Sequence, residues 1–343
     1  MKHGLLSSPD RPPTGERELI AEIRARVPPA PAWLTVGIGD DAAVAEPPKG
    51  ALEILTTDSL VESIHFDRRL STPADVGWKA LAVNLSDIAA MGGTPRLALL
   101  SLGLPEALDA GEVHALIDGF LLLAGQARVA LAGGNITRSP GPLIVDVTVT
   151  GFARRRHVLM RAGGRVGDDV YVTGEIGAAA AGLEYWKETK EATETTEIPG
   201  IYACIARHTR PEPRVRIGML LGRNSAATAC MDLSDGLADA VRQVAEASGT
   251  GAVIDASALP INDAARSWFI RSGRDPIIAA MAGGDDYELL FSAPRRWRGR
   301  LATVTRQARG VPIVRIGTLT AARELTLSRG GREEPLPAGF VHF

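Results

Sequence analysis

The stretch TPADVGWKALAVNLSDIAAMGGTPRLALLSLGL, residues 72–104, decides the fold class. Thr72 fits the N-cap position of a helix with Pro73 in its first turn, and the glycine pair at 92–93 is typical of a helix end. Residues 96–104 are apolar enough to form a buried strand directly after that helix. The stretch therefore predicts a helix followed by a strand, the alternation found in α/β and α+β proteins.

The same alternation continues on both sides of this stretch. Asp109 with Glu112 three residues later is typical of a capping pair and predicts a helix over 110–127. Further helices are expected over 16–26, 214–222 and 236–247, and further strands over 51–57, 129–132, 143–152, 169–173, 228–231, 252–254, 287–291 and 311–316. The fold class is therefore α/β (or α+β).

The chain of 343 residues is long enough for two domains. It turns basic and rich in glycine between residues 154 and 167, and we place the domain boundary there. The expected units are a disordered tail over 1–14, an N-terminal domain over 15–153 and a C-terminal domain over 154–343. The segment 187–197 has no apolar residue larger than Ala and is expected to be a solvated loop or helix extension.

Composition excludes several classes of function. The 38 basic and 40 acidic residues give a net charge of −2, which does not favour a nucleic-acid surface. Cys204 and Cys230 are too few for a disulfide scaffold or a thiolate metal site, so a reducing, cytoplasmic setting is expected. We expect no targeting segment, because the N-terminus lacks an apolar run of signal-peptide length. We expect no membrane span, because polar residues interrupt the most apolar run, 115–134.

Acidic residues gather at predicted strand ends and in glycine-containing loops. They lie at five places: Gly39–Asp41, Thr56–Asp58, Ser86–Asp87, Asp232–Gly236 and Gly283–Asp286. A strand end holds a carboxylate rigidly, and glycine lets a phosphate or metal approach the backbone. Mg²⁺ prefers such oxygen ligands together with substrate phosphates, so the pattern predicts metal-assisted phosphoryl transfer. Each place taken alone is also compatible with an ordinary turn.

Asp87 lies on an otherwise apolar face of the predicted helix. The other residues of this face are Val76, Ala80, Val83 and Met91, at helical spacing. A carboxylate in such a position is costly unless it is paired or bound to a metal. Both readings, a buried N–H partner and a metal ion, stay open at this point.

Seven motifs follow one another along the chain. They are GIGDDAAV (37–44), TTDSLVESIHF (56–66), GWKALAVNLSDIAAMGGTP (77–95), GGNITRS (133–139), RAGGRVGDDVYVTGEIG (161–177), MDLSDGL (231–237) and GGDDYELLF (283–291). This ordered set resembles the thiamine-monophosphate kinase family, part of the superfamily of aminoimidazole ribonucleotide synthetase and selenophosphate synthetase. The resemblance runs from about residue 15 to Phe343.

The resemblance implies a two-domain aminoimidazole ribonucleotide synthetase-like fold. Its N-terminal domain binds ATP and Mg²⁺ and pairs its sheet across a homodimer, and its C-terminal α/β domain completes the nucleotide and substrate site. The implied reaction transfers the γ-phosphoryl group of ATP to thiamine monophosphate, giving thiamine diphosphate, with several Mg²⁺ ions and with no nucleic acid or membrane as partner. Because the acceptor is an anionic phosphate, positioning and charge neutralisation carry the rate, and no strong base is needed.

The same resemblance implies roles for individual residues. The implied Mg²⁺ ligands are Asp41, Thr56, Thr57, Asp58, Asp87, Asn135, Asp232 and Asp235, among which Asp58, Asp87 and Asp232 are the implied catalytic residues. The implied ATP contacts are Gly134, Asn135, Arg161 and Ser234. The implied substrate contacts are His65, Asp285 and Phe340. Three of these residues also fit a purely structural interpretation. Arg161 fits a surface arginine, His65 a structural histidine, and Phe340 an aromatic residue that anchors the end of the chain in the core.

Three positions depart from the family's pattern. Asn135 stands where many relatives have Asp, and a neutral amide binds Mg²⁺ only through its carbonyl oxygen. Asp285 is one methylene shorter than the Glu common in relatives, and Pro337 stands where some relatives have Trp. Two alternatives therefore stay open: another ATP-using enzyme of the superfamily, or a catalytically weakened relative that binds thiamine phosphates or ATP.

Overall fold

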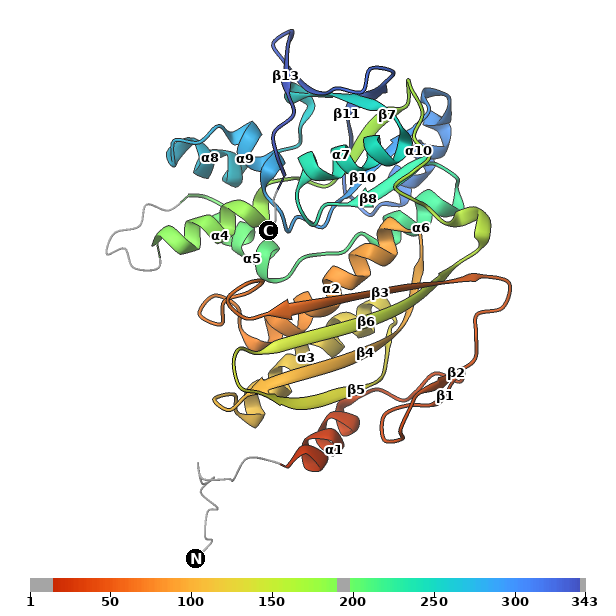
Figure 1. Ribbon diagram of the computed structural model, residues 1–343, viewed down its shortest axis with the longest axis vertical. Coiled ribbons are helices and arrows are strands. Elements are labelled where there is room, and N and C mark those ends of the chain that lie inside the picture. Colours follow the sequence, from red (N-terminus) through yellow and green to blue (C-terminus); the bar gives the residue numbers. More distant parts are fainter. Residues whose placement is uncertain (1–14, 190–197, 340–343) are drawn as a thin grey trace, which may run out of the picture.

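The computed structural model describes residues 15–189 and 198–339 of the chain. Figure 1 shows two domains stacked along the longest axis, each built around a sheet of its own. The N-terminal sheet has four strands in the order β3-β6-β4-β5, and the C-terminal sheet has seven in the order β13-β12-β9-β11-β7-β10-β8. The expected tail over 1–14, most of the segment 187–197 and Phe340 lie outside the described residues.

The N-terminal domain is a sheet with helices on one face. Its elements are α1 (Glu16–Arg26), β1 (Leu34–Val36), β2 (Val44–Ala45), β3 (Leu52–Val61), α2 (Pro73–Ala90), β4 (Thr94–Pro105), α3 (Ala110–Ala127), β5 (Ala130–Ser139) and β6 (Ile144–Ala153). In β6 every second residue is buried, as expected for a strand with one covered face. Figure 1 shows α2 and α3 along one face of this sheet and the other face uncovered.

Two glycines let α2 and α3 pack closely. A Cβ atom at Gly77 of α2 would lie 1.9 Å from the carbonyl oxygen of Leu116, and one at Gly119 of α3 would lie 2.0 Å from that of Ala74. Any larger residue would therefore push the helices apart. The close crossing fixes α2, which carries Asp87, relative to the sheet.

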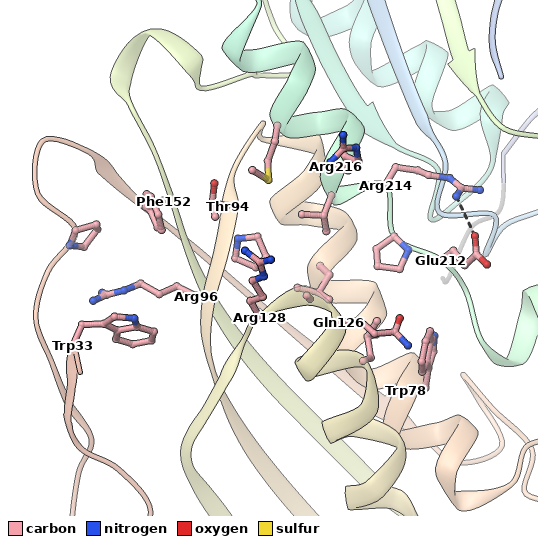
Figure 2. A pocket seen from close by; sticks show the side chains of 18 of the residues that line it. Trp33, Trp78, Thr94, Arg96, Gln126, Arg128, Phe152, Glu212, Arg214 and Arg216 are labelled. Carbon is pink, nitrogen blue, oxygen red and sulfur yellow. Dashed lines mark hydrogen bonds and ion pairs between the residues drawn. The ribbon is translucent and has the colours of Figure 1, made fainter. Parts of the chain in front are cut away.

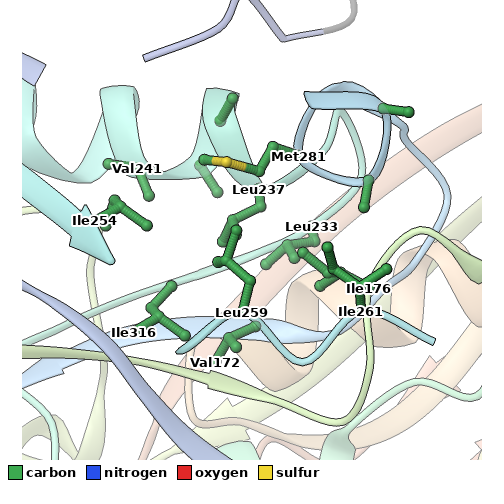
Figure 3. Packing of buried hydrophobic residues seen from close by; sticks show 14 of the residues in the cluster. Val172, Ile176, Leu233, Leu237, Val241, Ile254, Leu259, Ile261, Met281 and Ile316 are labelled. Carbon is green, nitrogen blue, oxygen red and sulfur yellow. The ribbon is translucent and has the colours of Figure 1, made fainter. Parts of the chain in front are cut away.

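The C-terminal domain covers its sheet with most of its helices. Its elements are β7 (Asp169–Thr173), α4 (Ala178–Thr189), α5 (Ile201–Thr209), α6 (Val215–Arg223), β8 (Ala229–Asp232), α7 (Leu237–Ser248), β9 (Gly251–Asp255), α8 (Asp263–Arg271), α9 (Pro276–Ala282), β10 (Leu289–Ala293), α10 (Arg298–Gln307), β11 (Ile313–Thr320), β12 (Leu325–Arg329) and β13 (Arg332–Pro335). Figure 3 shows its core, where Val172, Ile254 and Ile316 of the sheet lie near Leu237 and Val241 of α7. Burial of such aliphatic side chains is the main source of stability here.

The two domains meet along α2. Helix α6 packs on it so closely that a Cβ atom at Gly218 would lie 2.0 Å from the carbonyl oxygen of Ala89. Trp78 of α2 donates a hydrogen bond from its Nε1 to the carbonyl oxygen of Pro211 at 2.8 Å. Helix α2 is thus shared by both domains, and side chains along it can reach either sheet.

The predicted fold class is confirmed, and so are the main helices. α1 and α3 match the predicted helices 16–26 and 110–127, and both predicted caps, at Thr72 and at Asp109, form complete capping boxes. Among the described residues, no helix combines the length and the apolar character needed to cross a membrane.

Two expectations about strands are wrong. The strand expected to end at Thr57 continues as β3 to Val61, so Asp58 lies inside a strand. The strand expected to end at residue 132 continues as β5 to Ser139, so Gly133 and Gly134 lie inside a strand. Gly134 is needed there because a Cβ atom would lie 1.8 Å from the carbonyl oxygen of Leu100 on β4, so this glycine marks a close approach of two strands.

Candidate active site

Three carboxylates lie near one another where the two domains join. Asp58 comes from β3, Asp87 from the last turn of α2 and Asp232 from the end of β8. Burial raises the pKa of both Asp58 and Asp232, and the negative charge of Asp87 adds to each rise, so Asp87 interacts with both groups. We call Asp58, Asp87 and Asp232 the carboxylate cluster.

Hydroxyl groups hold two members of the cluster. Thr56 of β3 donates a hydrogen bond from Oγ1 to Oδ2 of Asp87. Ser86, fully buried on α2, donates from Oγ to Oδ2 of Asp232 at 2.7 Å. These two bonds tie α2 to a strand of each domain, so the cluster forms only when both domains are in place. Ser86 was singled out in the sequence together with Asp87, but no role was predicted for its hydroxyl group.

Burial and mutual repulsion shift the titration of the cluster. Burial, together with the charges of Asp87 and Asp146, raises the pKa of Asp58 to about 6. Burial and the charge of Asp87 raise the pKa of Asp232 to about 7. Burial also raises the pKa of Asp87, although the hydrogen bond from Thr56 and the charge of Arg161 oppose it. The cluster is therefore a place where positive charge is favoured.

The residues of the C-terminal domain near the cluster also have other partners. The charge of Arg161 acts on both Asp87 and Asp232, although its guanidinium group also donates to Oε1 of Gln243. Ser234 and Asp235 follow β8 after Leu233 and are half-buried. Among residues 15–189 and 198–339, no three His, Cys, Asp or Glu side chains form a group that could hold a metal ion by themselves.

Thr57 points to the opposite face of the sheet. Its Oγ1 lies 3.1 Å from Oγ1 of Thr148 and 3.3 Å from Oδ1 of Asp146, both on the uncovered face of β6. This follows from the alternation of side chains along β3, since Thr56 faces α2. The structure therefore separates the side chain of Thr57 from the carboxylate cluster.

Asp285 is held by groups from both domains. Lys79 of α2, whose side chain is only 3% exposed, donates from Nζ to Oδ2 of Asp285 at 3.0 Å. His208 of α5 places Nδ1 3.2 Å from the same oxygen. Burial favours the neutral acid, but the charge of Lys79 and the hydrogen bond with His208 outweigh it and hold the pKa of Asp285 well below its usual range. Burial and Lys79 lower the pKa of His208.

Tyr287 lies between Asp285 and the carboxylate cluster. Its hydroxyl donates to Oδ1 of Asp285 at 2.9 Å, and burial with the charges of Asp285, Asp232 and Asp58 raises its pKa. Asp285 and Tyr287 adopt positive φ angles of 66° and 50°, which non-glycine residues seldom do. This strained backbone presents both side chains at the domain junction.

His65 and Lys79 connect the predicted substrate residues. Lys79 donates a second hydrogen bond from Nζ to the carbonyl oxygen of His65 at 3.2 Å, so the structure brings His65 near Asp285. The ring of His65 accepts through Nδ1 from the backbone N–H of Val61 at 3.0 Å. No site role was predicted for Lys79 from the sequence. It nevertheless lies at four-residue spacing before Val83 and Asp87, on the helix face that singled out Asp87.

Three predicted site residues lie away from the cluster. Asn135 of β5 pairs with Ser101 of β4, which pairs with Asp146 of β6, which pairs with Ser59 of β3. Gly134 and Asn135 are thus at the far edge of the sheet from Asp58. Asp41 is exposed in the loop between β1 and β2, where its backbone N–H donates to Oδ1 of Asp40 at 2.9 Å.

A cavity of about 910 Å³ lies elsewhere at the domain junction. Figure 2 shows it between the ends of α3 and β4 on one side and the segment before α6 on the other. Its lining includes Trp33, Trp78 and Arg96 but none of the predicted site residues. The cavity and the carboxylate cluster are therefore separate places.

Comparisons with known proteins identify the family. Residues 39–153 match the AIR synthase related protein N-terminal domain, and residues 165–329 match the AIR synthase related protein C-terminal domain. A thiamine-monophosphate kinase of Salmonella typhimurium is 38% identical over 331 residues, which cover 96% of this chain and 98% of that relative. The chain belongs to the thiamine-monophosphate kinase family. The resemblance inferred from the seven motifs is thereby confirmed.

Solved structures of thiamine-monophosphate kinases have the same fold. The crystal structure of the enzyme from Stenotrophomonas maltophilia K279a has a TM-score of 0.79 and 37% identity, over 90% of this chain and 95% of that one. A structure of AaThiL complexed with AMPPCP and TMP has a TM-score of 0.75 and 33% identity, over 96% of this chain and 97% of that one. The two-domain architecture of this chain is thus the one found in its family.

Proposed function

We propose that this protein transfers the γ-phosphoryl group of ATP to thiamine monophosphate and releases thiamine diphosphate and ADP. The observation that carries the proposal is the carboxylate cluster at the domain junction of a chain of this family. AaThiL, solved with AMPPCP and TMP, is 33% identical to it over 96% of its length. In this chain the cluster lies beside Asp285, the expected substrate contact, with Tyr287 between them.

We propose that Mg²⁺ binds at the carboxylate cluster, with Thr56 and Asp235 nearby. The donor set fits, since carboxylate and hydroxyl oxygens are the ligands that Mg²⁺ prefers, and ATP phosphates would complete the coordination. The repulsion that raises the pKa of Asp58 and Asp232 supports the same assignment, because a cation would relieve it. Bound Mg²⁺ would neutralise charge on the phosphate oxygens.

The protein's own groups would bind and orient the two phosphates. We assign Arg161 and Ser234 to the ATP phosphates, because the charge of Arg161 acts beside the cluster and Ser234 follows Asp232 by two residues. We assign His65 and Asp285 to the thiamine monophosphate side. The acceptor oxygen is already anionic, so no residue has to remove a proton from it, and positioning supplies most of the rate.

We propose a homodimer formed through the uncovered face of the N-terminal sheet. Leu55 is 69% exposed and Leu99 is 39% exposed on this face, which supports burial against another surface. In a dimer, the site of one chain could receive Asp41, Gly134 and Asn135 from its partner. Their distance from the cluster of their own chain supports this arrangement.

Two further assignments complete the proposal. We propose that residues 15–153 and 154–343 are the two functional units. The first binds ATP and Mg²⁺ and forms the dimer, and the second completes the site. We also infer a cytoplasmic setting, supported by Cys204 and Cys230, which are both free thiols in the interior.

The activity is tested with purified protein, ATP, thiamine monophosphate and Mg²⁺. We expect thiamine diphosphate and ADP in equal amounts, loss of both with EDTA, and recovery with added Mg²⁺. Thiamine in place of thiamine monophosphate is the matched control, and it should give no product because it lacks the acceptor phosphate. Absence of thiamine diphosphate under saturating conditions would contradict the proposal.

Mixing inactive variants tests the shared site. Asp87→Asn and Asp41→Asn are expected to be inactive alone, but a co-expressed mixture should recover about a quarter of wild-type activity, because half of the dimers would carry one intact site. Asp87→Asn mixed with Asp232→Asn is the control and should recover nothing, since both residues belong to one chain's cluster. Equal activity of the two mixtures would argue against a shared site.

A further inference from the structure

The cavity in Figure 2 is separated from the active site by helix α2. Trp78 and Leu85 line the cavity and are seven residues apart, so they share one face of the helix. Asp87 follows Leu85 by two residues and therefore points to nearly the opposite face, toward the carboxylate cluster. A ligand in the cavity would touch neither ATP nor thiamine monophosphate, but it would touch the helix that carries Asp87.

Positive charge dominates the wall of this cavity. Its basic residues are Lys49, Arg96, Arg128, Arg214, Arg216 and Arg309, and its acidic residues are Glu46 and Glu212. Glu212 is engaged by Arg214 at 3.2 Å, and Arg214 is itself neutralised by the buried Glu288, so the other basic residues make up the excess of positive charge. Like charges gathered from two domains repel each other unless an anion lies among them. Arginine side chains in such an arrangement are typical of phosphate recognition.

Arg128 and Arg309 have no hydrogen bond or ion pair through their guanidinium groups among residues 15–189 and 198–339. Arg128 comes from the N-terminal domain, at the C-cap of α3, and Arg309 from the C-terminal domain, just after α10. Both have positive φ angles, 58° and 53°. Helices that end in this conformation usually have glycine there, because a side chain is unfavourable. Two arginines with this unfavourable backbone conformation line the same cavity, which indicates that their side chains have a function there.

Aromatic rings form another part of the wall. The guanidinium group of Arg96 stacks over the ring of Trp33 at 4.1 Å and is buried, so this pair is a rigid, flat surface. Trp78 and Phe152 also line the cavity (Figure 2). Flat surfaces of this kind stack on flat ligand rings.

We propose that this cavity is a second ligand site, which binds a small molecule carrying a diphosphate group and a flat ring. The diphosphate lies among the guanidinium groups of both domains, with Arg128 and Arg309 as its principal contacts. The ring lies against the aromatic wall. Because the site spans both domains and α2, its occupancy adjusts how the carboxylate cluster is assembled.

Calorimetry on the full chain tests the proposal. The active site is first saturated with AMPPCP, thiamine monophosphate and excess Mg²⁺, and the protein is then titrated with ADP, with thiamine diphosphate and with inorganic pyrophosphate. We expect one additional event per chain, in which one of the two organic diphosphates binds at least fivefold more tightly than pyrophosphate. No additional event with any of the three probes overturns the proposal, and equal affinity for all three overturns the assignment of a ring.

Glycine variants separate ligand binding from folding. Arg128→Gly and Arg309→Gly remove the guanidinium group and supply the residue that the backbone favours, so we expect an unchanged or higher Tm. Each should weaken the additional event at least tenfold. Arg323→Ala, at an exposed arginine outside the cavity, is the matched control and should bind as the wild type does. Unchanged binding in both glycine variants, or equal weakening in the control, overturns the proposal.

Discussion

Two sets of carboxylates, buried or half-buried, lie near Tyr287, and they differ in whether the protein supplies a cation in contact with them. In the carboxylate cluster, burial raises the pKa of each member, and the charge of Asp87 adds to the rise at Asp58 and Asp232. At Asp285 the ammonium group of Lys79 lies 3.0 Å away, and the pKa falls well below its usual range. The comparison indicates that the protein itself neutralises Asp285, whereas the carboxylate cluster is left for an external cation.

The largest effect is expected from removing charge in the cluster. Asp87→Asn should lower kcat by roughly 10³-fold, because the remaining groups would bind Mg²⁺ and ATP phosphates less well. Stability should stay the same or rise, since the change relieves repulsion with Asp58 and Asp232. Steady-state kinetics and the Tm without metal measure the two quantities. Asp118→Asn, at an exposed residue of α3, is the control.

Wild-type kinetics in Asp87→Asn would remove this residue from the active site. A fall in Tm together with the loss of activity would instead show a structural role. Only loss of activity with retained stability fits a carboxylate whose role is to bind an external cation.

Asp286, next to Asp285, extends the comparison to pH. Burial raises its pKa from 3.8 to about 7, although Asp286 accepts from the backbone N–H of Gly177 at 2.7 Å and the charge of Arg207 opposes the rise. Between these pH values the folded state keeps a proton that the unfolded state releases. The free energy of unfolding should therefore fall as pH rises from about 4 to about 7, by up to about 4 kcal/mol from this group.

Chemical denaturation at several pH values measures this dependence. Asp286→Asn should reduce the slope in that range, because the amide does not titrate, while Asp58 and Asp232, whose pKa values are also raised, still contribute to it. Asp118→Asn should leave the curve unchanged. Asp285 has the opposite sign: its low pKa gives stability that is present above about pH 4 and is lost as pH falls further. A slope in Asp286→Asn equal to that of the wild type would contradict the assignment.

Removing the protein's own cation should lower stability. Lys79→Met leaves Asp285 without its ammonium partner, and we expect a loss of about 2–4 kcal/mol in the free energy of unfolding. The urea midpoint measures it, and Lys49→Met, at an exposed lysine, is the control. The sign is opposite to that for Asp87→Asn, so the two variants together test the comparison. A stable Lys79→Met protein would show that His208 alone compensates Asp285.

The sequence predicted the parts of this molecule that depend on local pattern. Capping residues at Thr72 and Asp109 located two helices, and the apolar spacing on α2 singled out Asp87. The motif resemblance identified the family. Each of these signals lies within a short stretch of chain, and local geometry decides them.

What the sequence did not predict depends on contacts between distant segments. Gly134 was expected beyond the end of a strand, but its role is set by the backbone of Leu100 on another strand. Lys79 and His208 belong to the site because both reach Asp285, more than 70 residues further along the chain. The distance of Asn135 from Asp58 is a property of strand order, which no single motif contains.

The smallest effect is expected at the residue between the two sets of carboxylates. Tyr287→Phe removes only the hydroxyl that donates to Asp285 at 2.9 Å, so we expect a loss of about 1 kcal/mol in stability. Asp285 would then be held less firmly, and the KM for thiamine monophosphate should rise more than kcat falls, because Asp285 is assigned to substrate binding and the cluster to the chemistry. Tyr202→Phe, at an exposed tyrosine of α5, is the control. If kcat instead falls with KM unchanged, the Tyr287 hydroxyl serves the carboxylate cluster, and the two sets of carboxylates work as one network.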